Sequence, residues 1–113
     1  MEFEINLIKG NNFFYNCPDR ALKDLRNVEI SKNLSLVILV IDSNTEEKDF
    51  NNALIKISSL KKPLILYTSG SRDIDWLYKN NNIKKYSLHS IVSTPLRLIS
   101  DMYAILSTHK NDK

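Results

Sequence analysis

The sequence contains little glycine and only one cysteine. The two glycines, Gly10 and Gly70, cannot form a P-loop, which needs two glycines and a lysine in register. Nor can they form a dinucleotide-binding loop, which needs three glycines. Cys17 alone provides neither an internal disulfide nor a thiolate zinc cluster. These absences remove several classes of enzyme and metalloprotein, and no catalytic signature takes their place.

Long apolar runs and a basic leader are also lacking. The longest uncharged apolar run, Leu34–Ile41, has 8 residues, which is too short to cross a bilayer. The first residues, Met1–Ile5, carry acids where an export signal would need basic residues. Together with the single thiol, these features predict a cytoplasmic protein that has no membrane partner.

The charge is spread along the chain. The net charge is +3, but basic residues occur as scattered pairs such as Lys61-Lys62 and Lys84-Lys85. A nucleic-acid surface would need them concentrated on one face, so the pattern argues against a nucleic-acid partner and leaves an accessory role there as a weaker alternative. With 113 residues, of which 42% are hydrophobic and 26% charged, the chain has the composition of one globular domain. We expect that domain to span residues 1–108, followed by a disordered tail at 109–113.

The amino-terminal third is expected to contain two short strands and a helix. Glu2–Lys9 alternates apolar and polar residues, and Phe13–Tyr15 is a second β-prone run. These runs predict a hairpin or, as an alternative, the first and second strands of a shortened parallel sheet. Pro18 suits the first position of a helix, and the apolar residues that follow it at helical spacing are Ala21, Leu22, Leu25 and Val28.

The remainder of the chain alternates between strands and helices. Three apolar runs predict strands, at Ser35–Ile41, Leu64–Thr68 and Ser90–Ser93. The first of the helices between and after these strands has caps available at Ser43, Asn44 and Thr45 and an apolar stripe at Phe50, Ala53, Leu54, Ile57 and Leu60. Ser71 is expected to cap a short helix that turns Ile74, Leu77 and Tyr78 toward the sheet. Thr94-Pro95 should begin a last helix with one apolar face formed by Leu96, Ile99, Tyr103 and Leu106.

This alternation predicts the fold class. Strands joined by helices through short connections form a parallel sheet that is covered by helices on its faces. We therefore expect an α/β, flavodoxin-like three-layer sandwich with a mostly parallel sheet of about five strands, and with a shortened amino-terminal part.

From Leu34 to the end, the chain resembles the receiver domains of bacterial two-component signalling. The resemblance is carried by Leu36–Asp42, by Leu64–Gly70 and by Ile91–Pro95, the last of which is similar to the fifth strand of a receiver, where a Lys-Pro dipeptide precedes the final helix. Within this group the chain is most similar to two degenerate members, the α/β/loop domain of phosphorelay hybrid kinases and the amino-terminal domain of flagellar sigma-54 activators. Both imply a role in protein contacts.

The chain departs from the receiver pattern where phosphorylation would occur. A working receiver holds Mg²⁺ with acids after its first strand, phosphorylates an aspartate on its third strand and has a lysine on its fifth. Here Leu7–Gly10 contains no acid pair, Thr94 (or Ser93) takes the place of the lysine, and Val40 takes that of the aspartate, two residues before Asp42. The resemblance therefore implies a pseudo-receiver that is not phosphorylated on aspartate.

Polar residues at two strand ends are candidates for ligand binding. Asp42 follows a central strand, where α/β folds place ligands, but the same residue can begin a turn that caps the next helix. Thr68, Ser69 and Ser71 could hold an anion with their hydroxyl groups, or could form a capped turn with Ser71 as the cap. His89 and His109 have no third ligand at metal spacing, so no metal site and no cofactor are expected.

Aromatic residues suggest where a partner would bind. Trp76 is expected to point partly outward, and exposed tryptophans are common at protein contacts. With Tyr86, Arg97 and Tyr103 it forms the predicted contact surface. The main hypothesis is thus a non-enzymatic, receiver-like regulatory domain that binds another protein (a signalling kinase, a regulator or its own dimer mate). The alternative is a domain that binds a small ligand or phosphate, or a minimal enzyme, using Asp42 and the Thr68–Ser71 loop.

Overall fold

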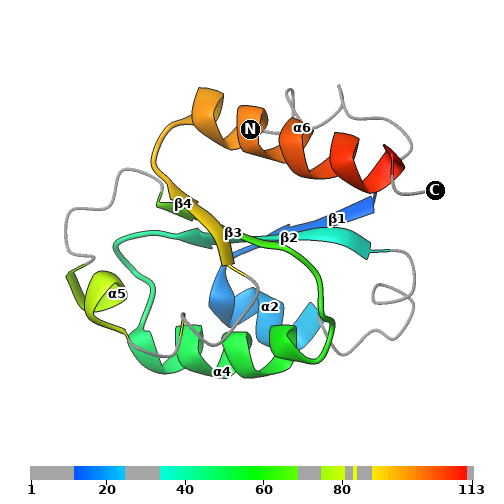
Figure 1. Cartoon of the computed structure of the whole chain (residues 1–113). Coiled ribbons are helices and arrows are strands. Elements are labelled where there is room, and N and C mark those ends of the chain that lie inside the picture. Colours follow the sequence, from blue (N-terminus) through cyan, green and yellow to red (C-terminus); the bar gives the residue numbers. More distant parts are fainter. Residues whose placement is uncertain (1–11, 25–33, 69–74, 81–82, 84–87, 112–113) are drawn as a thin grey trace.

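The computed structural model describes residues 12–24, 34–68, 75–80, 83 and 88–111, and these form a three-layer α/β arrangement (Figure 1). Four strands form the central sheet: β1 (Asn12–Asn16), β2 (Leu34–Ile41), β3 (Leu64–Thr68) and β4 (Leu88–Val92). They lie in the order β1-β2-β3-β4, and every pair is parallel. The predicted α/β fold with a parallel sheet is therefore confirmed, with four strands in the described residues where about five were expected.

Strand β1 bears on the two interpretations of the amino-terminal region, a hairpin or two strands of a parallel sheet. Phe13–Tyr15 belongs to β1 and pairs in parallel with Leu36–Ile38 of β2. It thus takes part in the parallel sheet, as the second of the two amino-terminal interpretations requires of it. The other predicted strand of that region, Glu2–Lys9, lies outside the described residues.

The strand order decides where the helices lie. Connections between neighbouring parallel strands are right-handed, so crossovers that all step in one direction place their helices on one face of the sheet. Figure 1 shows α2 (Pro18–Asp24), α4 (Glu47–Ser58) and α5 (Asp75–Lys79) on one side of the sheet, and α6 (Pro95–Asn111) on the other. Helix α6 runs three residues into the segment 109–113 that the sequence predicts to be a tail.

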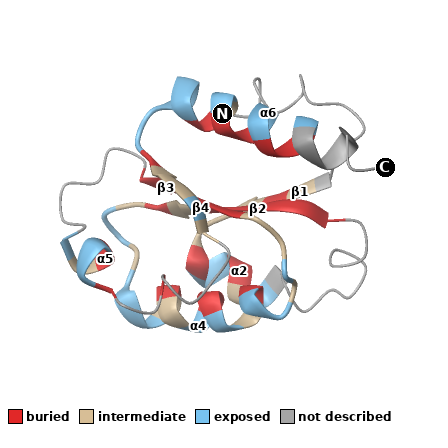
Figure 2. Cartoon of the chain, viewed as in Figure 1, coloured by how far each residue is buried: buried red, intermediate tan, exposed pale blue. Residues whose placement is uncertain are grey.

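One apolar core lies on each face of the sheet. The buried residues are concentrated on the strands and on the sides of the helices that face them (Figure 2). Strand β2 contributes to both cores, with Val37 and Leu39 packed on the α4 side and Leu36 and Ile38 on the α6 side. Both faces of this strand are buried, which explains why its sequence is a continuous apolar run.

Helix α4 follows its predicted stripe but not its predicted cap. The buried residues Phe50, Ala53, Leu54 and Ile57 are those of the stripe. The N-cap position is held by Glu46, whose side chain makes no capping hydrogen bond, so the caps predicted at Ser43, Asn44 and Thr45 are wrong. These three residues instead belong to the turn that Asp42 begins, in which the Thr45 N–H donates to the Asp42 carbonyl at 3.1 Å.

The predicted inward face of the last helix is partly wrong. Leu98, Met102, Ile105 and Leu106 of α6 are buried against the sheet. Leu96 is 81% exposed and Tyr103 is 40% exposed. Because the apolar residues cover a wide arc of this helix, the sequence contains two overlapping stripes, and only packing against the sheet selects between them.

The short helix α5 also differs from expectation. Leu77 is buried as predicted, but Tyr78, which was expected to face the sheet, is 62% exposed. Trp76 is the residue that turns toward the core, where it is half-buried. Ile74 and the predicted cap Ser71 lie outside the described residues. Among the helices that are described, none is long and apolar enough to cross a membrane.

Candidate functional site

A hollow of about 550 Å³ opens at the carboxyl ends of β1 and β2. We call it the edge hollow. On one side it is formed by the beginning of α2, and on the other by the turn after β2 and the beginning of α4. The residues that line it include Cys17, Asp19, Arg20, Asp42, Glu46 and Asp49.

Asp42 lies in this hollow, and its carboxylate is used by its own turn. Oδ1 accepts a hydrogen bond from the Asn44 N–H at 2.9 Å and one from Thr45 Oγ1 at 3.2 Å. The Asp42 N–H in turn donates to Thr45 Oγ1 at 3.0 Å. This is the self-bonded turn that aspartate often forms, as one of the two interpretations of Asp42 predicts, but the turn does not cap α4, whose N-cap residue is Glu46. Asp42 nevertheless remains half-buried at the edge of the hollow.

The thiol of Cys17 faces the same carboxylate. Its Sγ lies 3.9 Å from Asp42 Oδ2, with the sulfur as the weak donor. Burial raises the pKa of this thiol, and the carboxylates of Asp42 and Asp19 raise it further, against an opposing effect of Arg20. A thiol with a raised pKa stays protonated at neutral pH, so Cys17 is not an activated nucleophile.

Acidic side chains that the sequence reasoning did not single out complete the hollow. Asp19 and Asp49 lie in the first turns of α2 and α4, and Glu46 is the N-cap residue of α4. Carboxylates at these positions complement the helix dipoles, so each has a local structural reason to be there. The sequence signal that could have found them is the recurrence of acids just after two strands that turn out to be neighbours. Within the described part of the chain, no group of three residues could hold a metal ion.

Thr68 lies at the same edge of the sheet but is differently engaged. It pairs with Ile41, the residue before Asp42, so the structure brings these two predicted ligand positions to adjacent strand ends. The Thr68 side chain is buried, and its hydroxyl donates to the Val92 carbonyl at 3.3 Å. That bond ties the end of β3 to the end of β4. The other two members of the predicted anion loop, Ser69 and Ser71, lie outside the described residues.

The predicted contact surface is divided between two layers. The Trp76 ring packs edge-on against Phe50 of α4, with ring centroids 5.3 Å apart and planes at 66°. Arg97 and Tyr103 belong to α6, on the opposite face of the sheet (Figure 1). Trp76 therefore cannot share one flat contact surface with Arg97 and Tyr103, and Tyr86 lies outside the described residues.

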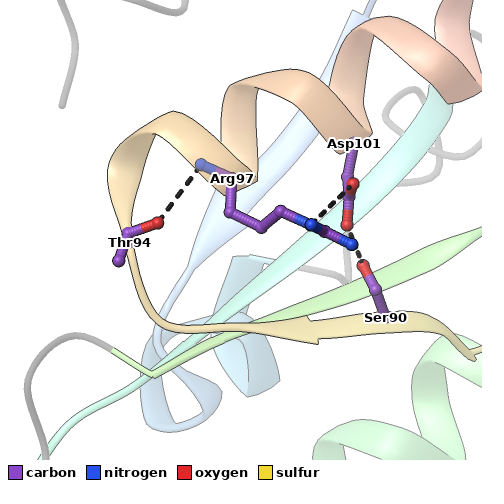
Figure 3. A network of polar contacts seen from close by, with 4 residues as sticks. All are labelled: Ser90, Thr94, Arg97 and Asp101. Atoms are coloured by element: carbon purple, nitrogen blue, oxygen red, sulfur yellow. Dashed lines mark hydrogen bonds and ion pairs between the residues drawn. The ribbon is translucent and has the colours of Figure 1, made fainter.

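A polar network holds α6 to the edge of the sheet (Figure 3). Asp101 Oδ2 accepts a hydrogen bond of 2.6 Å from Ser90 Oγ, and Asp101 Oδ1 lies 3.5 Å from Arg97 Nε. At the start of the helix, Thr94 Oγ1 accepts the Arg97 N–H at 3.3 Å, one residue before Pro95, as the Thr-Pro signal predicts. Thr94 thus caps the beginning of α6 and Ser90 anchors its second turn, and no lysine takes the place of Thr94.

Comparison of the chain with protein-family models, with curated proteins and with solved structures finds no match. The likeness to receiver domains therefore rests on the sequence pattern alone.

Proposed function

We propose that the chain is a non-enzymatic, receiver-like regulatory domain that works by contact with another protein and is not phosphorylated on aspartate. In this proposal the partner is a kinase or regulator of bacterial signalling in the cytoplasm, or a second copy of the chain. The fold is compatible with this role, because the four parallel strands and their helices are consistent with a flavodoxin-like domain.

The observation that carries the proposal is the outer face of α6. Leu96 is 81% exposed and Tyr103 is 40% exposed. They are seven residues apart, which places them two helical turns apart on the same side of the helix. The side chain of Arg97 beside them is 71% exposed. An exposed leucine, tyrosine and arginine on one rigid helix form the kind of surface that partners bind. The α6 surface, defined by these three residues, replaces the surface centred on Trp76.

The residues at the former phosphorylation positions support a role without phosphate. Val40, at the acceptor position, is half-buried and packs into the core under α6. The carboxylate of Asp42 accepts two hydrogen bonds at Oδ1 from its own turn, which gives this residue a structural role. NMR titration with Mg²⁺ and beryllofluoride, which stands in for a phosphoryl group, tests this part. Saturable shifts at Asp42 would show that a phosphate site exists.

The α6 surface is tested with paired variants. Leu96→Ser removes an exposed apolar side chain from α6, and Tyr78→Ser removes one from α5 on the opposite face. We expect the first to weaken association about tenfold or more, whether self-association in sedimentation velocity or binding to a purified cognate kinase or regulator. The second should leave it within about twofold. Equal effects of the two variants, or none of Leu96→Ser, would show that α6 is not the contact surface.

The alternative of a phosphate ligand or a minimal enzyme is less favoured by the geometry. The edge hollow presents four carboxylates and one guanidinium, a charge distribution that repels phosphate. Thr68 already donates its hydroxyl to Val92. A thermal-shift screen with phosphates, nucleotides and flavins distinguishes the two proposals, because a ligand at 100 times its Kd adds about 2.7 kcal/mol to the stability. A reproducible shift with any of them would favour the ligand-binding alternative.

A further inference from the structure

A groove of about 610 Å³ runs between α2 and α4, on the face of the molecule opposite α6. We call it the helix groove. Its apolar part consists of Leu22, which is half-buried, and Ile55, which is 61% exposed. Ile55 lies on the outer side of α4, away from the buried stripe, so packing in the core does not explain why this position is apolar.

The helix groove adjoins the edge hollow. Asp19 of α2 and Asp49 of α4 line both of them. The two carboxylates therefore stand between a polar, acid-lined end at the sheet edge and an apolar stretch along the helix pair. A ligand that fills both parts must be longer than a single ion and must combine charge with apolar surface.

The charge at the sheet-edge end opposes that of the whole chain. The chain has a net charge of +3, whereas the edge hollow contains four carboxylates and one guanidinium. Within the part of the chain that the structure describes, the one ion pair joins Arg97 to Asp101, on the other side of the sheet. The carboxylates of Asp19, Glu46 and Asp49 are thus available to a positively charged ligand, and they would repel a phosphate backbone.

The far end of the helix groove carries the opposite sign. Lys23 and Lys56 line it, and Lys56 Nζ donates to the Leu22 carbonyl at 2.8 Å, which fixes the lysine at the wall of the groove. The surface is therefore negative at the sheet edge, whereas farther along the helix pair the apolar side chains lie beside two lysines. This order of charges distinguishes one orientation of a bound segment from the other.

We infer that the edge hollow and the helix groove together dock a basic, amphipathic segment of a partner polypeptide. Arginine or lysine side chains of the segment occupy the edge hollow, and its aliphatic side chains cover Leu22 and Ile55. Arginine suits the hollow best, because its planar guanidinium can bind carboxylates in a bidentate manner. The inference goes beyond the α6 surface and does not depend on it, since the two lie on opposite faces of the sheet.

The test uses a fluorescein-labelled, ten-residue peptide with two arginines at one end, two leucines in the middle and a glutamate at the other end. Fluorescence anisotropy measures its binding to the full chain at low salt. We expect saturable binding that weakens about tenfold between 50 and 300 mM NaCl. A peptide with the arginines replaced by glutamates should bind at least tenfold more weakly.

Matched variants locate the binding on the protein. Asp49→Asn removes a carboxylate that lines both the edge hollow and the helix groove, and Glu47→Gln removes one from the same helix that lines neither. We expect a three- to fivefold weaker binding for the first and less than a twofold change for the second. Ile55→Ser should weaken binding about fivefold, and Tyr78→Ser, on α5, should not.

Three results would overturn the inference. Equal binding of the basic and acidic peptides would show that the charge of the hollow does not select the ligand. Equal effects of Asp49→Asn and Glu47→Gln would show that the peptide binds elsewhere. Complete displacement of the peptide by an equal concentration of spermidine would show that a small cation binds as well as the peptide does, and that the apolar groove plays no part. Because these readouts use the peptide and the groove variants, they can fail while the α6 surface stands, and the reverse holds as well.

Discussion

The Ser90–Asp101–Arg97 network allows a sharp prediction about what holds α6 to the sheet. Asp101 is buried in a helix that otherwise packs through apolar side chains, and its own side chain is 13% exposed. Its carboxylate has a short hydrogen bond to Ser90 Oγ, at 2.6 Å, and a longer contact to Arg97 Nε, at 3.5 Å. The two partners differ in exposure, because Ser90 is half-buried on β4 whereas the Arg97 side chain is 71% exposed.

Exposure decides which contact contributes more. Ser90→Ala leaves the nearly buried carboxylate without its hydroxyl donor. A charge-assisted hydrogen bond of this kind contributes about 1.5–3 kcal/mol, so we expect Ser90→Ala to lower the free energy of unfolding by about 2 kcal/mol. Arg97→Gln removes an exposed pair at i and i+4, and solvent screening limits its contribution to about 0.3–0.5 kcal/mol. The hydrogen bond from the neutral serine should therefore contribute more to the free energy of unfolding than the ion pair with Arg97.

Urea unfolding at 25 °C, followed by circular dichroism, measures both values. Ser100→Ala, an exposed serine on the same helix, is the matched control and should lie within about 0.5 kcal/mol of the parent. Added salt should reduce the small effect of Arg97→Gln and leave that of Ser90→Ala unchanged. If Arg97→Gln proved more destabilising than Ser90→Ala, the assignment of the anchoring role to Ser90 would be refuted.

Three further predictions concern other parts of the fold. Lys61, in the connection between α4 and β3, has a φ of 53°, so Lys61→Gly should raise the free energy of unfolding by about 0.5–1 kcal/mol in urea titration. A lower free energy of unfolding would contradict the left-handed conformation. Trp76→Ala should lower the free energy of unfolding, measured by circular dichroism, by about 2–3 kcal/mol, because it removes the ring that packs on Phe50. An unchanged free energy of unfolding would show that the ring lies in solvent. Because folding raises the pKa of the Cys17 thiol, this thiol loses its proton at a lower pH in the unfolded chain than in the folded one. The free energy of unfolding should therefore fall as the pH rises above about 8.5, and Cys17→Ser should remove this part of the pH dependence.

The parts of the fold that the sequence predicts are those with one dominant signal. The run Leu36–Ile41 contains too many consecutive apolar residues for a strand with a solvated face, so its burial on both faces could be anticipated. The stripe of α4, from Phe50 to Ile57, is apolar on one side and polar on the other, so its inward face was also determined. In both elements the local pattern and the tertiary packing agree.

The elements that were assigned wrongly lack such a signal. The apolar residues of α6 cover a wide arc of the helix, so choosing the buried Leu98 and Met102 over the exposed Leu96 and Tyr103 required knowledge of the sheet beneath it. Helix α5 has only 5 residues, little more than one turn, and a periodicity cannot be read from so short a segment. Its assignment therefore exchanged the roles of Trp76 and Tyr78.

The candidate sites depend on strand order, which is a tertiary property. Asp19 and Asp49 are 30 positions apart in the sequence, and they meet because β1 and β2 are neighbours and α2 packs against α4. Among the described helices, the same strand order places α2, α4 and α5 on one face and α6 on the other. The helix groove and the α6 surface are therefore separated by the whole thickness of the sheet. Substitutions at sites this far apart, with no shared contacts, are normally additive, so a partner on one face should change binding on the other little unless the sheet itself deforms.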